Sequence, residues 1–337
     1  MQLYNKLSAE ERANIIDQNS QERVILSFYK YFKLGNPSLL RDHLFFLWSD
    51  LDVLGRIYVA KEGINAQLSV PKYCFEKFKI SVNEIVPLKN IRLNIALEHY
   101  SKSFLKLTIK IRDKIVADGL DDSSFDVTKV GEHLDAKRFN EMLNNKNTIC
   151  IDMRNHYESE IGHFKNAILP QSETFKQELP MVKQLLSENK NDKILLYCTG
   201  GIRCEKASAY LKHNGFRDVN QLHGGIINYK KQLIENPKLE NKFIGKNFVF
   251  DERLSEKISE EVISFCHQCG SKCDTHINCK NMSCNLLFIQ CEKCKEKFNS
   301  CCSSECKKIM DLPENEQKNL RQGSVNKKRF NSHRIIN

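Results

Sequence analysis

The chain has 337 residues, of which 52 are Lys or Arg and 42 are Asp or Glu, for a formal net charge of +10 at pH 7. This length exceeds one compact core of ordinary size, so we expect two or three domains. Residues 1–20 are polar and contain no apolar signal segment, and the apolar run 44–48 is too short to span a bilayer. We therefore expect a soluble, cytoplasmic protein without a membrane partner.

The 14 cysteines are unevenly distributed. Cys74, Cys150, Cys198 and Cys204 are scattered, whereas the other ten lie between positions 266 and 306. A disulfide framework is not expected without a secretory signal, and such clustering indicates metal binding in a reducing compartment.

The first domain is expected over residues 20–117. Apolar patterns predict strands at 23–32, within 56–70 (two strands), at 91–97 and at 105–116, and helices at 37–51 and 73–82. This order, β-α-β-β-α-β with an extra strand, is that of a ferredoxin-like domain.

Basic residues on the later strands make this domain a candidate RNA-binding domain. They are Arg92, Lys106, Lys110 and Arg112, and the alternative is an ordinary solvated strand face. In the segment Lys61-Glu62-Gly63-Ile64-Asn65, a tight turn explains Gly63, while Lys61 and Asn65 are candidates for ligand contact.

Residues 118–130 are polar and acidic and are expected to be a linker, followed by a second domain over 131–235. Its pattern predicts helices at 136–144, capped by Asp135, and at 178–188, with strands at 148–152, 167–169, 194–197 and 219–222. Alternating strands and helices imply a parallel sheet, at whose carboxyl edge ligands gather. Asp152 and Cys198 both lie at such strand ends.

The stretch after the strand 194–197 carries the strongest catalytic signal. Cys198 is followed by the active-site loop Thr199, Gly200, Gly201 and Ile202 and by a helix that begins near Arg203. Backbone N–H groups, the helix dipole and the Arg203 charge all favour a thiolate, so Cys198 is the candidate nucleophile and Arg203 its partner. The alternative is that Cys198 is a small hydrophobic residue at a strand end.

Three neighbouring residue sets are less decisive. Asp152 and Arg154 support the site, more plausibly as a structural ion pair than in direct catalysis. Cys204 either resolves a persulfide or is buried against the sheet. The His133-x-Asp135 spacing fits part of an iron site, but a helix cap explains Asp135 better.

The module 260–306 contains four cysteine pairs, enough for two zinc sites of four thiolates each. The ligands are Cys266, Cys269, Cys279, Cys284, Cys291, Cys294, Cys302 and Cys306. The spacing leaves open which pairs combine, whether His267 or His276 substitutes, and whether an iron–sulfur cluster replaces zinc. The remaining residues 307–337 carry eight Lys and Arg against three Asp and Glu and are expected to be a disordered basic tail, for phosphate binding or for solubility.

Several of these motifs resemble a rhodanese domain. They are the Cys198-x4-Arg203 loop, Ile151-Asp152-Met153-Arg154, Tyr157-Glu158, residues 161–168 and Leu222-His223-Gly224-Gly225-Ile226. The resemblance implies an α/β domain with a mainly parallel sheet and a cysteine that carries a persulfide. The loop is one residue shorter than the Cys-x5-Arg loop of cysteine phosphatases, which suits sulfur chemistry.

The whole architecture resembles the bacterial oxygen-dependent tRNA uridine hydroxylases. The resemblance rests on Lys61-Glu62-Gly63-Ile64-Asn65, on Ile115-Val116-Ala117-Asp118-Gly119, on the segment from Cys198 to Lys206 and on the cysteine-rich module. It implies formation of 5-hydroxyuridine at the wobble position of tRNA, with dioxygen as co-substrate and Cys198 as the essential cysteine.

The chain has no nucleotide-binding glycine fingerprint, so the oxidant and the electron source stay open. Our hypothesis is that Cys198, as thiolate or persulfide, attacks the uracil ring or an oxidant close to it. Two alternatives are a sulfurtransferase that passes persulfide sulfur to tRNA or a carrier protein, and a non-catalytic, zinc-stabilised RNA-binding protein.

Overall fold

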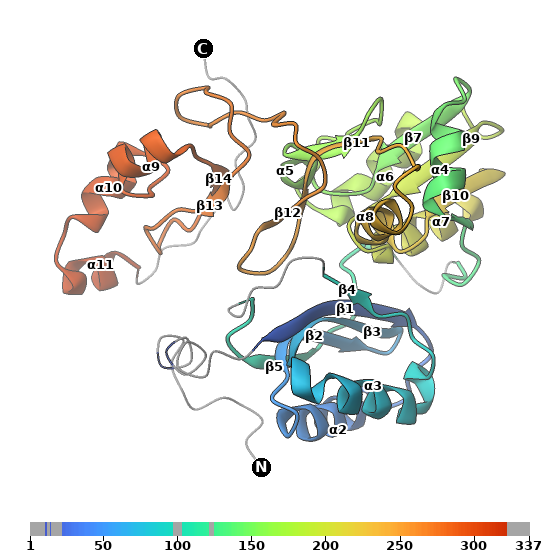
Figure 1. Cartoon of the computed structure of the whole chain (residues 1–337), viewed down its shortest axis with the longest axis horizontal. Helices are drawn as coiled ribbons and strands as arrows, with labels where there is room; N and C mark the ends of the chain where they lie inside the picture. Colours follow the sequence, from blue (N-terminus) through green and yellow to red (C-terminus); the bar gives the residue numbers. More distant parts are fainter. Residues whose placement is uncertain (1–10, 12–13, 15–21, 97–102, 121–124, 322–337) are drawn as a thin grey trace.

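The computed structural model describes residues 11, 14, 22–96, 103–120 and 125–321, which form three parts (Figure 1). In Figure 1 the N-terminal domain lies below, the central domain above it, and the cysteine-rich part beside the central domain. Within these described residues, no helix combines the length and the apolar character that crossing a membrane requires.

The N-terminal domain is a five-stranded sheet with two helices. Its elements are β1 (Arg23–Tyr31), α2 (Pro37–Ser49), β2 (Leu54–Ala60), β3 (Gly63–Pro71), η1 (Lys72–Cys74), α3 (Phe75–Glu84), η2 (Val86–Leu88), β4 (Asn94–Ile95) and β5 (Leu107–Ile111). The strand order is β4-β1-β3-β2-β5, and only the pair β2 and β5 is parallel. The expected ferredoxin-like arrangement with an extra strand is confirmed.

The last two strands are shorter than the sequence predicts. Residues 97–102, at the end of the expected strand 91–97, lie outside the described part of the chain. Beyond Arg112 the chain leaves the sheet, because the N–H of Ile115 donates to the Glu62 carboxylate at 2.8 Å instead of to a strand.

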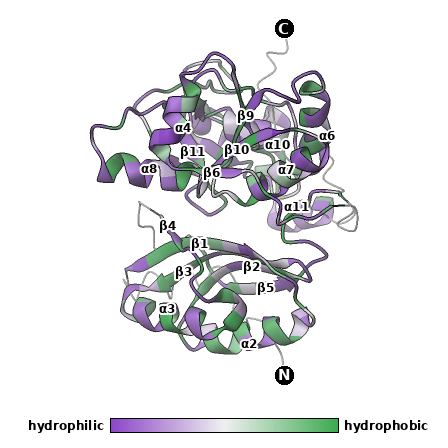
Figure 2. Ribbon diagram, turned by 90° about the vertical axis from the view of Figure 1, so that its right-hand side faces the viewer, coloured by the Kyte–Doolittle hydropathy of each residue, from purple (hydrophilic) through white to green (hydrophobic). Residues whose placement is uncertain are grey.

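The two faces of this sheet differ in polarity because side chains alternate along each strand. One face packs on α2 and α3, with Phe28, Trp48 and Phe78 fully buried between them. Figure 2 shows both helices on the side away from the central domain. The opposite face therefore presents its polar side chains, including Ser27, Tyr29, Tyr58, Asn65 and Gln67, to the central domain.

The central domain is built on a four-stranded parallel sheet in the order β6-β10-β9-β7. Its elements are β6 (Glu132–Leu134), α4 (Ala136–Leu143), β7 (Thr148–Asp152), α5 (His156–Ser159), β8 (Gly162–Phe164), α6 (Phe175–Leu185), β9 (Lys193–Tyr197), α7 (Ile202–His213), β10 (Asp218–Leu222) and α8 (Gly225–Glu235). The predicted parallel sheet is confirmed, and the Asp135 side chain caps α4 by accepting from the N–H of Arg138 at 2.8 Å.

Two sequence predictions for this domain are corrected. The expected strand 167–169 is only an isolated bridge between Ile151 and Ile168. The helix expected at 178–188 begins earlier, at Phe175, because the Thr174 side chain accepts from the N–H of Gln177 and caps it.

The first strand of the C-terminal part, β11 (Phe243–Phe248), pairs with a strand of the central domain. This part also comprises β12 (Ser255–Lys257), β13 (His276–Asn278), β14 (Leu287–Ile289), α9 (Glu292–Phe298), α10 (Ser304–Met310) and α11 (Glu314–Arg321). Strand β11 pairs with both β8 and β12. Residues 307–321, expected to be disordered, lie largely in α10 and α11, and residues 322–337 of the predicted basic tail lie outside the described residues.

A buried ion cluster joins the N-terminal and central domains. The ammonium of Lys206, on α7, lies 2.6 Å from the Glu62 carboxylate and 3.0 Å from that of Asp118, over the ring of Tyr31. Lys206 and Asp118 are almost completely buried. Asp118, which the sequence analysis assigns to a linker, is therefore part of a domain interface.

Replacing Lys206 by Met should destabilise the fold, because it removes the cation that Glu62 and Asp118 share in a buried site. Asp118 keeps a second cation, the Lys114 ammonium at 2.7 Å. Removing one partner of a buried pair costs about 3–5 kcal/mol, and we expect the free energy of unfolding to fall by about that amount. Urea unfolding followed by the fluorescence of the single tryptophan, Trp48, measures the change.

The matched control is Lys231→Met. Lys231 pairs with Glu235 on α8, and both side chains are 61 % exposed, so the free energy of unfolding should change by less than about 0.5 kcal/mol. Equal stabilities for the two variants would contradict the role given to Lys206.

Candidate active site

Cys198 lies between the end of β9 and the start of α7, in a loop that turns backbone N–H groups toward its sulfur. The N–H of Gly201 donates to the Cys198 Sγ at 3.1 Å. Gly201 has φ of +101°, and a Cβ there would lie 2.5 Å from the hydroxyl oxygen of Tyr29. Only glycine fits this position, because the backbone conformation and the close approach both exclude a side chain.

The surroundings of Cys198 favour its thiolate. Burial by itself would raise the pKa of this thiol, but the Cys204 thiol, the Arg203 charge and the N–H groups of Cys204 and Gly201 lower the pKa to about 6. Cys204 is fully buried, and its own pKa is raised by burial and by Cys198. Cys204 therefore acts as a neutral donor to the Cys198 thiolate.

Arg203 is held in place by a buried carboxylate. Its guanidinium forms two hydrogen bonds with Glu158, at 2.6 and 2.8 Å, and Glu158 has no exposed surface. Glu158 also accepts from the hydroxyl of Thr199 at 3.4 Å. In the sequence, Glu158 stands out only as part of the Tyr157-Glu158 motif, and its position in a capping box on α5 gives no signal for this distant partner.

Asp152 and Arg154 form a fully buried ion pair, with two hydrogen bonds at 2.6 and 2.9 Å. Arg154 also donates to the carbonyl oxygen of Gly162 at 2.6 Å. Neither residue lines the cavity next to Cys198. The contacts thus favour the structural interpretation of this pair.

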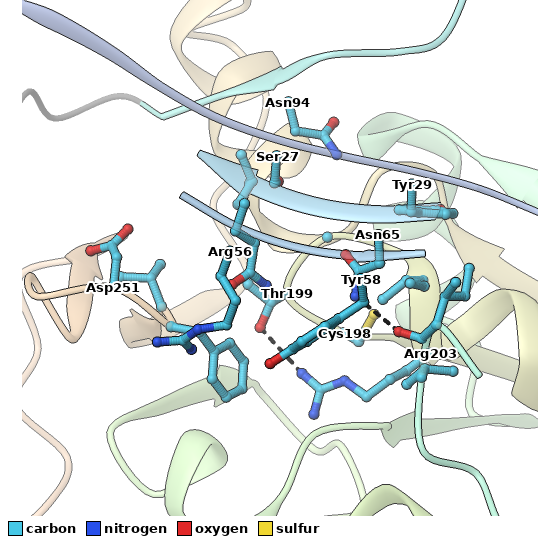
Figure 3. A pocket seen from close by; sticks show the side chains of 18 of the residues that line it. Ser27, Tyr29, Arg56, Tyr58, Asn65, Asn94, Cys198, Thr199, Arg203 and Asp251 are labelled. Atoms are coloured by element: carbon cyan, nitrogen blue, oxygen red, sulfur yellow. Dashed lines mark hydrogen bonds between the residues drawn. The ribbon is translucent and has the colours of Figure 1, made fainter. Parts of the chain in front are cut away.

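A cavity of about 690 Å³ separates Cys198 from the polar face of the N-terminal sheet (Figure 3). The sheet lines it with Ser27, Tyr29, Arg56, Tyr58, Asn65, Gln67, Asn94 and Arg112; the loop with Cys198, Thr199, Gly200, Ile202 and Arg203; and the segment after β11 with Phe250, Asp251, Arg253 and Glu256. Residues 114–117, Asn155, Tyr157 and residues 173–175 line it as well, so the site is built from segments far apart in the chain. No sequence pattern singles out the segment after β11 as part of the site.

The candidate RNA-binding residues occupy different positions. Asn65 and Arg112 line the cavity, and the Arg112 guanidinium lies 5.5 Å from the ring centre of Tyr58. Arg92 covers the backbone next to the Cys198 loop, since a Cβ on Gly224 would lie 2.7 Å from its Cζ. The others, Lys61, Lys106 and Lys110, are exposed and outside the cavity lining.

The His133 imidazole has protein partners. Its Nε2 lies 2.9 Å from the Glu205 carboxylate, which also accepts from the Tyr29 hydroxyl at 3.2 Å. Asp135 caps α4 instead of facing His133 as a ligand. Among the described residues, groups of three or more potential metal ligands occur only in the cysteine-rich part.

In the cysteine-rich part, eight cysteines form two groups of four. Within each group the sulfur atoms all lie within 4.8 Å of one another, and the groups are Cys266, Cys269, Cys291 and Cys294, and Cys279, Cys284, Cys302 and Cys306. The pair Cys266 and Cys269 thus combines with Cys291 and Cys294, and the pair Cys279 and Cys284 with Cys302 and Cys306. The spacing in the sequence alone does not decide between the possible combinations. Either group can bind a metal ion.

The leftover candidates lie outside both groups. His267 contacts Glu160 through its Nε2 at 2.8 Å, and burial and neighbouring cations lower the pKa of His276 to about 3. Cys273 and Cys301 belong to neither group of four.

Three family models match successive parts of the chain. The UPF0176 acylphosphatase-like domain matches residues 23–115, the rhodanese-like domain residues 135–232 and the rhodanese C-terminal model residues 244–307. These matches follow the three parts of the fold.

Several proteins are similar over nearly the full length. The tRNA uridine(34) hydroxylase of Leptospira interrogans is 55 % identical over 97 % of this chain and 89 % of its own length. The tRNA uridine(34) hydroxylase of Photorhabdus laumondii is 52 % identical over 96 % of this chain and 92 % of its own length. That of Hamiltonella defensa is 51 % identical over 99 % of this chain and 94 % of its own length. At this identity and coverage, the chain belongs to the tRNA uridine(34) hydroxylase family.

Proposed function

We propose that this protein converts uridine 34 of tRNA to 5-hydroxyuridine, with dioxygen as co-substrate and Cys198 as the catalytic residue. The observation that carries the proposal is the position of Cys198, a cysteine of lowered pKa, at a cavity whose opposite wall is a polar sheet face. The cavity volume falls within the roughly 300–1,000 Å³ typical of small-molecule sites. A tRNA substrate would place the reaction in the cytoplasm.

The base of uridine 34 must turn out of the stacked anticodon loop to reach Cys198. Bases in single-stranded RNA loops are readily splayed out, and enzymes that modify a base take it into a pocket. The exposed Lys110 pairs with Tyr58 and so lies on the cavity side of β5, and the exposed Lys106 directly precedes this strand. Both would contact phosphate groups outside the pocket.

The thiolate supplies a nucleophile for the uracil ring. Addition of the Cys198 sulfur to C6 moves an electron pair toward C5 and O4, and C5 becomes an electron-rich carbon. C5 then forms a bond with one oxygen atom of dioxygen. Loss of the C5 proton and departure of the Cys198 thiolate restore the aromatic ring and the free enzyme.

The electrons balance only with a reductant. One oxygen atom of dioxygen enters the C5–OH group, and the other leaves as water after taking up two electrons and two protons. An external two-electron donor supplies these electrons. Glu158 holds the Arg203 guanidinium in place, so the positive charge stays near the Cys198 sulfur both when the thiolate adds to C6 and when it departs.

Replacing Cys198 by Ala should abolish 5-hydroxyuridine, because no other thiol lines the cavity among the described residues. Mass spectrometry of tRNA nucleosides from cells that lack the gene and carry either the wild-type or the variant chain measures the product. Retained binding of an anticodon stem–loop shows that the variant is folded.

The control is Cys74→Ala. Cys74 is a buried cysteine of the N-terminal core, away from the cavity lining, so the modified base should persist. If Cys198→Ala preserves 5-hydroxyuridine, the proposed role of Cys198 is wrong.

Sulfur transfer is the second candidate function, favoured by the Cys-x4-Arg loop and the rhodanese-like match at residues 135–232. A persulfide on Cys198 would then deliver its outer sulfur to tRNA or a carrier. The same nucleoside analysis separates the two functions, since a thiolated base would replace the hydroxylated one.

The reactivity of Cys198 should follow the titration of its thiol. The fraction of thiolate rises through pH 6 and levels off above it, so alkylation by iodoacetamide should be half-maximal near pH 6. Peptide mass spectrometry reads each cysteine separately, and buried Cys150, whose pKa burial raises, should react only at much higher pH.

A double variant tests the cause of this low pKa. The double variant Arg203→Met, Glu158→Gln removes the guanidinium and also removes the charge of the buried carboxylate that would otherwise lose its partner. The alkylation midpoint should move up by about one unit or more. An unchanged midpoint would assign the low pKa to the backbone and Cys204 alone.

We propose that zinc occupies both groups of four cysteines. Four thiolates match the tetrahedral preference of structural zinc, and each group has the required number of sulfur atoms close together. Bound zinc would supply structural stability to a module with few apolar residues to bury.

The purified protein should contain two zinc ions per chain, and Cys291→Ala should lower this content to about one, because three thiolates hold zinc more weakly than four. Elemental analysis measures the content, and Cys273→Ala, outside both groups, is the control. Iron with inorganic sulfide, and the visible absorbance of a cluster, would contradict the assignment.

A further inference from the structure

Asn65 occupies the centre of the polar sheet face, between two tyrosines. It pairs with Tyr29 on β1 and with Tyr58 on β2, so the three side chains form one row on the same side of the sheet. All three line the cavity, and Figure 3 shows Asn65 and Tyr58 on the side of the sheet that faces Cys198. A planar base held over Asn65 would meet an aromatic ring on either side.

The amide of Asn65 has a fixed orientation. Its Nδ2 donates to the carbonyl oxygen of Ile115 at 3.2 Å. A carbonyl oxygen only accepts, so the opposite orientation of the amide would set two acceptors against each other. Oδ1 has no hydrogen-bond partner among the described residues and presents an acceptor alone to the cavity.

We propose that Asn65 Oδ1 accepts the N3–H of the substrate uracil and makes the site specific for uridine over cytidine. Uracil presents a donor at N3, whereas cytosine presents a lone pair there, which would repel Oδ1. The inference rests on the proposed function and assigns to one atom the choice of base at the same site. A site built to bond a particular N–H rejects a base that lacks it, because the buried partner is left unpaired.

The neighbouring row of the sheet presents polar groups of another kind. Ser27, Gln67 and Arg56 are paired in register across β1, β3 and β2, and Asn94 follows on β4. These four side chains line the cavity and have no hydrogen bond or ion pair within the described part of the chain. They would contact the sugar and phosphate groups that all nucleotides share.

The experiment measures binding of the full-length protein to three anticodon stem–loop RNAs that differ only at position 34. These carry uridine, cytidine or 3-methyluridine, and fluorescence anisotropy gives each Kd. The wild-type protein should bind the uridine loop about tenfold or more tightly than the other two, and Asn65→Ala should reduce this preference to about twofold or less.

Two further variants separate recognition from structure. Asn65→Asp keeps the accepting oxygen but loses the donor to Ile115, so the preference for uridine should persist even if overall affinity falls. Gln67→Ala, on the neighbouring row, should weaken binding of all three loops alike. If Asn65→Asp loses the preference as fully as Asn65→Ala does, the contact with Ile115 explains the effect and the inference is overturned.

The two proposals fail in different ways. A wild-type protein that forms 5-hydroxyuridine while Asn65→Ala keeps the full preference for uridine overturns only the role of Asn65. A wild-type protein that binds the three loops equally and yields no 5-hydroxyuridine overturns the proposed function itself.

Discussion

The buried ammonium of Lys206 determines how the two halves of the site face each other. It lies on α7, whose first residues close the Cys198 loop, and its partner Glu62 lies in the turn that leads into β3 and Asn65. Lys206 lies only eight positions after Cys198, and Asn65 only three positions after Glu62. This ion cluster, together with the hydrogen bond from the Tyr29 hydroxyl to Glu205, therefore holds the nucleophile at a set distance from the polar sheet face.

A cluster of this kind is better suited to specifying geometry than to adding stability. Burying an ion pair has a desolvation cost that often equals its attraction, and an apolar pair of similar volume would do as well for stability alone. Charge imposes a direction that apolar contacts lack, because Lys206 must meet Glu62 and Asp118 together. We infer that this directional requirement explains why a charged cluster, and not an apolar one, lies at this interface.

The sequence predicted the features that depend on local pattern and missed those that depend on distant partners. Alternating apolar residues located β1 to β3, and Asp135 was identified as a cap from its position alone. Glu158 pairs with Arg203 across 45 residues and Glu62 with Lys206 across 144, separations that no periodicity encodes. The 167–169 strand was wrong because Ile168 forms only a single bridge, although its apolar neighbours match a strand pattern.

The cysteine-rich part contributes to the site through packing. Leu287 and Ile289, on β14, pack with Tyr157 and Ile161, which flank the Glu158 that holds Arg203. His267, which follows Cys266 of the first group, contacts Glu160 at the end of α5.

A chain of contacts thus runs from β14 through α5 to Arg203, whose charge lowers the pKa of Cys198. Order in the cysteine-rich part supports the position of Glu158, and Glu158 in turn fixes the charge that favours the thiolate. We infer that the cysteine-rich part thereby acts on the reactivity of Cys198, since its packing against α5 supports the carboxylate that holds Arg203.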